Sequence, residues 1–175
     1  MTAKLPEPEF SWPFAVDRLG TSPVTVSIVA KPEQCARLAR RLGLVAIERL
    51  AASATLRRLP GVDIIHVDGR FEADIVQTCV VTLAPFQTHV VDELEGDFGG
   101  APEAAAEVSV AMDEDPPEPI ENGVIDIGEL AAQFLSLSLE PYPRSPGVAL
   151  EEVWGRPDPE SESPFAVLRA IRPKA

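Results

Sequence analysis

The stretch IIHVDGRFEADIVQTCVVTL, residues 64–83, decides the fold class. It is rich in β-branched residues and predicts a long strand with core positions at Val67, Phe71, Ala73 and Ile75. The dipeptide Asp68-Gly69 inside it favours a hairpin turn, or else a bulge in one bent strand, because an isolated glycine within a strand often marks a bulge. In either case this part of the chain belongs to a β-sheet.

Strand patterns flank this stretch on both sides. Residues 45–59 place Ala51, Ser53, Thr55 and Arg57 opposite an apolar row, and the dipeptide Pro60-Gly61 then signals a turn. Alternation resumes at residues 88–94, after a break at Ala84-Pro85. Residues 24–30 also alternate with period two. We therefore expect a curved, mostly antiparallel sheet built from residues 24–94.

Two helices are predicted beside the sheet. Apolar residues recur at spacings of three and four from Pro32 to Leu42, and Gly43 supplies the stop. The second helix is expected at residues 127–139, where Asp126 and Glu129 have the spacing of a capping box and Leu130, Phe134 and Leu137 form the apolar stripe. Together with the sheet, these helices predict an α+β domain over residues 1–147.

Two segments differ from this pattern. Residues 99–123 contain a Gly-Gly pair, an alanine run and many acidic residues, which predicts a mobile acidic insertion. Residues 148–175 form an acidic, proline-containing tail, in which Phe165, Leu168 and Ile171 make a short apolar segment able to dock as one or two helical turns.

The charge is distributed unevenly along the chain. The formal net charge is -13, which argues against a simple polyanion-binding domain. However, residues 1–60 hold nine basic and five acidic side chains, residues 61–100 one and eight, and residues 101–175 five and fifteen. The balances are thus +4, -7 and -10, so only the first third of the chain is basic.

The inventory of reactive side chains is small. Cys35 and Cys79 stand far apart, and only two histidines are present, so the sequence predicts no structural zinc site and no metal. Cys79 is placed in the middle of a strand, where a packed thiol is the favoured interpretation over a nucleophile. No hydrolase triad or phosphate-binding glycine loop is recognisable. No signal sequence or membrane span is predicted, so we expect a cytoplasmic protein without membrane contact.

The arginines are the candidate nucleic-acid ligands. Arg37, Arg40 and Arg41 point away from the apolar stripe of the first helix, and Arg57 and Arg58 end the strand that follows it. If helix and strand present them on one surface, they bind phosphates. The alternative is a solvated face or pairing with the protein's own carboxylates.

Three stretches, taken in order, resemble the YceD family of large ribosomal RNA subunit accumulation proteins, and its alphaproteobacterial branch most closely. They are QTCVVTLAPF at 77–86, DIGEL at 126–130 and LSLEPYPR at 137–144. Similarity extends from the strand and helix before residue 42 to PFAVL at 164–168, nearly the whole chain. The positions that match the family motif are Cys79, Pro85, Asp126, Glu129, Pro141, Tyr142, Pro143 and Arg144.

The resemblance has limits at single residues. Many relatives have a second cysteine at the position of Thr82, so a metal or redox role for that pair does not carry over to this chain. Asp126, Glu129, Pro141 and Arg144 also fit plain roles as helix cap, helix stop and local ion pairs. Arg144 is the first choice for a ligand contact, because a guanidinium between prolines is preorganised for a phosphate or carboxylate.

The resemblance implies a non-enzymatic, cofactor-free bacterial factor for 23S rRNA accumulation or processing in large-subunit assembly. In the first hypothesis, its arginines bind precursor 23S rRNA. In the second, it is an acidic binding module or chaperone for a basic ribosomal protein of the large subunit. The third, a hydrolase or nuclease, is weakest because no compact cluster of Asp, Glu and His is predicted.

Overall fold

The computed structural model of the protein describes residues 8–99 and 116–148, and its fold is α+β. Five strands form one open sheet in the order β2-β3-β4-β5-β6, in which only the β5–β6 pair is parallel. Two short strands, β1 and β7, form a second sheet. The elements are β1 Pro13–Ala15, a 3-10 turn Val16–Arg18, β2 Val24–Val29, α1 Pro32–Leu42, β3 Ala46–Arg58, β4 Ile64–Thr78, β5 Pro85–Gly99, β6 Glu118–Pro119, β7 Val124–Asp126 and α2 Ile127–Ser138.

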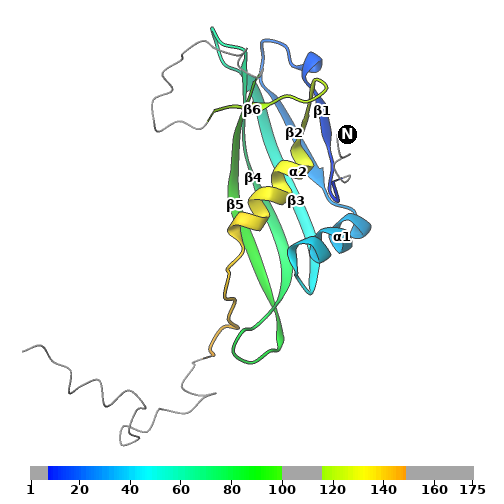
Figure 1. Ribbon diagram of the computed structural model, residues 1–175, viewed down its shortest axis with the longest axis vertical. Helices are drawn as coiled ribbons and strands as arrows, with labels where there is room; N and C mark the ends of the chain where they lie inside the picture. Colours follow the sequence, from blue (N-terminus) through cyan, green and yellow to red (C-terminus); the bar gives the residue numbers. More distant parts are fainter. Residues whose placement is uncertain (1–7, 100–115, 149–175) are drawn as a thin grey trace, which may run out of the picture.

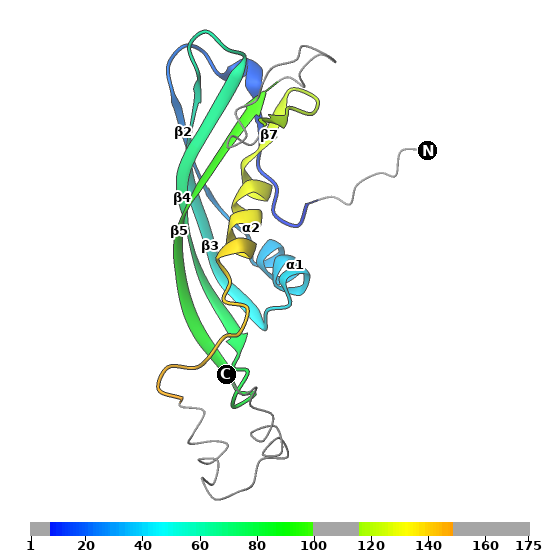
Figure 2. The same ribbon diagram turned by 60° about the vertical axis from the view of Figure 1, so that its left-hand side comes forward.

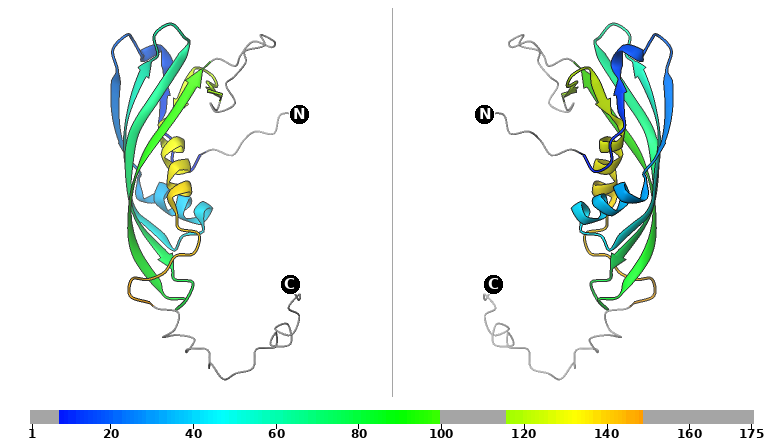
Figure 3. Two further views of the ribbon diagram at one scale, coloured as in Figure 1. Left: turned by 90° about the vertical axis from the view of Figure 1, so that its left-hand side faces the viewer. Right: turned by 90° about the vertical axis from the view of Figure 1, so that its right-hand side faces the viewer.

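Both helices cover the same face of the sheet. Figure 1 shows α1 and α2 in front of the long strands, and Figures 2 and 3 show that the sheet curves around them. The covered face carries the core, which includes Leu50, Leu56, Val67, Phe71 and Ile75. The other face, here called the outer face, is left open by the described residues. The curved antiparallel sheet with two helices is thus as predicted.

The interpretation of Asp68-Gly69 is wrong on both of its alternatives. The strand β4 runs through this dipeptide without a turn, and its pairing with β3 and β5 is continuous there. Gly69 is required for a different reason: a Cβ atom would overlap the Ser53 carbonyl oxygen and lie 2.7 Å from the Cα of Ala54. The glycine therefore permits a close approach of β3 to β4.

The two helices begin and end at the expected signals. Gly43 closes α1 in the left-handed region at φ 68°, and the side chain of Gln34 accepts a hydrogen bond from Lys31 N at 2.8 Å. Asp126 caps α2 by accepting hydrogen bonds from Gly128 N and Glu129 N. The predicted stripe of α2 is wrong at Leu137, whose side chain is 79% exposed. The buried face is formed instead by Ile127, Leu130, Ala131 and Leu135.

The insertion predicted at 99–123 is wrong at its ends. Gly99 ends β5, and it pairs with Pro119 of β6 while Phe98 pairs with Glu118. A bridge between Glu121 and Val124 then leads into β7. The central residues 100–115 lie outside the described part of the chain, as does the predicted apolar segment of the tail at 165–171.

Candidate functional site

A cleft of about 480 Å³ lies at the end of the sheet where β4 gives way to the β4–β5 turn, residues 79–84. We call it the end cleft. Its walls come from the end of α1 with the residues after it, the end of β4 with Val80 of the turn, and the end of α2 with the strap, residues 140–145, that follows it. Figure 2 shows the course of the strap below α2. The apolar lining is contributed by Leu42, Leu44, Val80, Leu139, Pro141 and Pro143.

Gln77 is the polar side chain in this lining that is almost fully buried. It is 6% exposed and is the one buried polar residue among residues 8–99 and 116–148. It stands in the core row of β4, two positions after Ile75. Within the same ranges its carboxamide forms no hydrogen bond to another side chain or to the backbone, and its polar atoms are not among the fully buried unpaired ones, where Thr88 Oγ1 stands alone. The carboxamide of Gln77 therefore keeps contact with solvent at the end cleft.

The strap is held against the β4–β5 turn by backbone and thiol contacts. Val80 N donates a hydrogen bond to Pro143 O at 2.9 Å. The turn itself is closed by hydrogen bonds from Cys79 N to Ala84 O and from Leu83 N to Cys79 O, both 2.9 Å. Leu83 has a left-handed backbone at φ 58° and a side chain that is 76% exposed. An apolar residue in this conformation is strained, which is most common at functional sites.

The placement of Cys79 in the middle of a strand is wrong. The residue follows β4 and begins the turn, so its buried thiol lies among hydrogen-bond donors of the turn and the strap and not among strand side chains. Donation from the Ser145 backbone and from Thr82 lowers the pKa of the thiol to about 6. Thr82 N lies 3.5 Å from the Cys79 sulfur, so Thr82 is a direct neighbour of the thiol.

The other residues of this region that carry the resemblance lie in β5 and in the strap. Pro85 begins β5 directly after the turn. Pro141 and Pro143 line the end cleft, and Tyr142 between them is 71% exposed. Arg144 lies in the strap next to Pro143. The stretches at 77–86 and 137–144, far apart in sequence, therefore meet at one end of the molecule.

The DIGEL stretch anchors the opposite end of α2. The Asp126 carboxylate accepts hydrogen bonds from Ser11 Oγ at 2.5 Å and Trp12 N at 2.7 Å, besides those from Gly128 N and Glu129 N. Gly128 is packed against the N-terminal segment so closely that a Cβ atom would lie 2.8 Å from both Phe10 O and Trp12 N. These contacts fix the start of α2 to residues 10–12.

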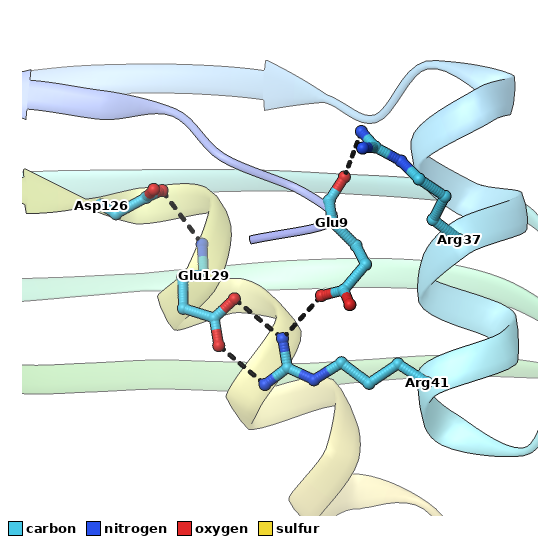
Figure 4. A network of polar contacts seen from close by, with 5 residues as sticks. All are labelled: Glu9, Arg37, Arg41, Asp126 and Glu129. Carbon is cyan, nitrogen blue, oxygen red and sulfur yellow. Dashed lines mark hydrogen bonds and ion pairs between the residues drawn. The ribbon is translucent and has the colours of Figure 1, made fainter. Parts of the chain in front are cut away.

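Arg41 joins α1 to this anchor (Figure 4). Its guanidinium donates to both carboxylate oxygens of Glu129, at 2.7 and 3.0 Å, and to Glu9 at 2.9 Å. The hydrogen bond from Arg41 lowers the pKa of Glu9, and the two carboxylates raise the pKa of Arg41. Arg37 donates to Glu9 O at 3.1 Å. These two arginines are therefore engaged with groups of the protein itself.

The six candidate RNA ligands do not form one surface. Arg58 donates to the carbonyl oxygens of Leu19 and Val16, both at 3.2 Å. Arg57 lies on the outer face, opposite to the helices, at 3.8 Å from Asp68. Arg40 on α1 donates only to Ala36 O of its own helix among the described residues. The condition for a joint phosphate-binding surface, that helix and strand present their arginines together, is not met.

The outer face divides into two halves. On β2 and β3 it holds small hydroxyl residues, where Thr25 meets Thr55 at 3.0 Å and Ser27 meets Ser53 at 3.3 Å. On β4 and β5 it holds a set of carboxylates that we call the acidic stripe: Asp68, Glu72, Asp74, Glu93, Glu95 and Asp97. Within the described ranges, Glu93 and Glu95 have no arginine or lysine within 4.0 Å. Glu72 is paired with Arg49 of β3 at 2.6 Å, and Arg70 lies among these carboxylates on β4. This half of the sheet therefore carries a net negative charge that is concentrated on β5.

Both histidines pair with aspartates across β4 and β5. His66 Nδ1 lies 2.7 Å from Asp97, and His89 Nδ1 lies 2.7 Å from Asp74. Each pair occupies directly opposed positions of the ladder, so both contribute to its register. No group of three metal-ligating side chains is present among residues 8–99 and 116–148.

Sequence reasoning missed Gln77 and Gly128. Gln77 continues the row of Ile75 in β4, so a polar residue at a core position was the signal available for it. Gly128 carries no comparable local signal, because its need for space depends on a segment more than a hundred positions away.

Comparison with protein-family models, with curated proteins and with solved structures finds no match. Within the described ranges, no helix has both the length and the apolar character needed to cross a membrane.

Proposed function

We propose that this protein is a non-enzymatic ribosome biogenesis factor that supports 23S rRNA accumulation and processing during large-subunit assembly in the bacterial cytoplasm. The observation that carries the proposal is the meeting of the family-like stretches 77–86 and 137–144 around one cleft. Residues that share a motif and also share a place are best explained by a common binding task.

The direct partner in this proposal is a basic ribosomal protein of the large subunit. Two observations support it over RNA. Arg37, Arg41 and Arg58 are engaged within the protein. The acidic stripe offers an anionic surface that attracts lysines and arginines and repels phosphates. Association of this kind weakens as salt is added.

RNA binding remains the second candidate, supported by the exposed position of Arg40 on α1. The two candidates differ in their response to charge reversal. Replacing Glu93 and Glu95 together by lysine weakens capture of large-subunit proteins at low salt if the partner is a basic protein. Replacing Arg40 and Arg57 together by glutamate abolishes association with precursor rRNA if the partner is RNA, and that result contradicts the protein proposal.

Depletion in growing cells tests the cellular role. We expect precursor 23S rRNA to accumulate and mature large subunits to fall, with rescue by the natural chain. The measurement is the ratio of precursor to mature 23S rRNA ends, together with the subunit profile. Unchanged rRNA and subunit levels after full depletion contradict the proposal.

A further inference from the structure

We propose that the end cleft binds an extended segment of a partner protein, in which an apolar side chain stands next to a lysine or arginine. The site and its ligand chemistry are argued from the cleft alone, whereas the identity of the partner as a ribosomal protein rests on the proposed function above.

The side chain of Gln77 indicates that the ligand has an extended backbone. A carboxamide offers one N–H donor side and one carbonyl acceptor, the complement of a single peptide unit. A ligand that fills the end cleft removes the solvent from this carboxamide, and burying it without partners costs free energy, so the ligand must pair with both groups. The peptide groups of a helix are already bonded to one another, so the complementary ligand is a segment whose backbone N–H and C=O are free.

The lining and the rim of the end cleft indicate that the ligand inserts an apolar side chain. The cleft volume of about 480 Å³ lies within the range of small-ligand and peptide-anchor pockets. The segments that meet at this end also hold five of the nine large apolar side chains that are exposed among the described residues: Val45, Val80, Leu83, Leu137 and Tyr142. Such a concentration is typical of an interaction surface.

Glu140 indicates that a lysine or arginine stands next to the apolar side chain of the ligand. It is the one charged residue in the cleft lining, it is exposed, and within the described residues it has no basic side chain within 4.0 Å. A lysine or arginine beside the apolar anchor of the ligand complements this carboxylate at the rim. Charge complementarity therefore selects a basic segment over a neutral or acidic one.

Selection of peptides against the full chain tests this inference. A phage-displayed library of random peptides is the probe, and recovered sequences are remade as synthetic peptides for affinity measurement. We expect an apolar residue next to Lys or Arg in the recovered set. We also expect Gln77→Leu and Val80→Arg each to weaken binding at least about tenfold. The matched control Val62→Arg, at an exposed valine in the turn at the opposite end of the sheet, leaves affinity unchanged.

A second arm needs no altered protein. Methylating the peptide nitrogens one at a time removes single N–H donors, and we expect one position at which affinity falls by about tenfold. Equal affinity for all the methylated peptides overturns the pairing with Gln77. Equal binding by the natural chain and the Val80→Arg chain overturns the location.

Two other occupants have distinct signatures, and each overturns the inference. If the protein's own residues 165–171 fill the cleft, replacing Phe165 and Leu168 by aspartate raises peptide affinity. If a second copy fills it, the natural chain dimerises and Val80→Arg makes it monomeric. Normal 23S rRNA in cells that carry Val80→Arg, with peptide binding lost, overturns the ribosomal role while the peptide site stands.

Discussion

The two ends of α2 are held in different ways. At the start of the helix, Asp126, Gly128 and Glu129 connect with the N-terminal segment and with Arg41 through many short polar contacts. At its end, Ser138 donates to Asp92 at 2.7 Å, Leu137 is exposed, and the strap makes few bonds to the β4–β5 turn. The first end has the character of a structural anchor, whereas the second leaves polar and apolar groups open for a ligand.

Asp126→Ala, at the start of α2, is expected to cause the largest loss of stability. It removes the helix cap and leaves Ser11 Oγ and Trp12 N without their acceptor, so the free energy of unfolding falls by about 3 kcal/mol. The matched control is Asp92→Ala at the other end of the helix, which loses two exposed hydrogen bonds, from Ser138 Oγ and from Glu93 N, and has a much smaller effect. Urea unfolding of both variants checks this, and equal losses contradict the contrast between the ends.

Gly128→Ala is expected to cause the second largest loss of stability. The added methyl group meets backbone atoms of residues 10–12 that cannot rotate away, so we expect a loss of about 2 kcal/mol. Gln133→Ala, at an exposed position of the same helix, is the control and changes stability little. Thermal unfolding measures both. A Gly128→Ala protein as stable as the control shows that the N-terminal segment does not press on the helix start.

Arg41→Ala has a smaller effect because its ion pairs are partly exposed. We expect a loss of about 1 kcal/mol that shrinks in high salt, and almost none for Arg40→Ala. The lowered pKa of Glu9 adds stability above its ordinary value of 4.5, and this contribution is lost as the pH falls through the folded value. In Arg41→Ala the acid decline should therefore be shallower. Unfolding curves of the natural chain and of Arg41→Ala, recorded from neutral to acid pH, test this. A parallel decline in the stability of the two proteins contradicts it.

Cys79→Ser concerns the strap end and is expected to change the pH dependence of stability. The folded pKa of about 6 lies below the ordinary 9.0, so the thiolate contributes stability at pH 9 that declines as the pH falls to about 6. Serine does not titrate there, so the variant should show a flatter stability curve between these values. Cys35→Ala is the control. Burial raises the pKa of Cys35, so this thiol does not titrate between pH 6 and pH 9, and the stability of the variant should change with pH as in the natural chain. An unchanged slope in Cys79→Ser contradicts the assignment.

Alternation and capping signals predicted most elements, because these depend on neighbours in sequence. The strands β2, β3 and β5, the helix α1 and the cap Asp126 follow from such local rules. The β4–β5 turn was predicted too late, as a break at Ala84-Pro85, because Val80 and Val81 continue the β-branched run of β4 and conceal its end at Thr78. Gly69 was misread because its role depends on how closely β3 approaches, which no local pattern reports.

The candidate site was predictable only in its parts. Helical spacing placed Arg37, Arg40 and Arg41 on an exposed side of α1. The groups that bind two of them come from residues 9 and 129, which lie 28 to 88 positions away in sequence. The motif stretches were recognised one by one, yet their meeting around the end cleft is a consequence of tertiary structure. A surface formed by distant segments cannot be read from spacing.

Site-specific photo-crosslinking in growing cells tests the central claim most directly. A photoreactive amino acid replaces Leu83 in the β4–β5 turn, and Val62 in the turn at the opposite end of the sheet serves as the control. The account predicts that position 83 crosslinks to a basic protein of the large subunit and that position 62 does not. Crosslinks of equal yield from both positions, or crosslinks from position 83 only to RNA, would contradict it.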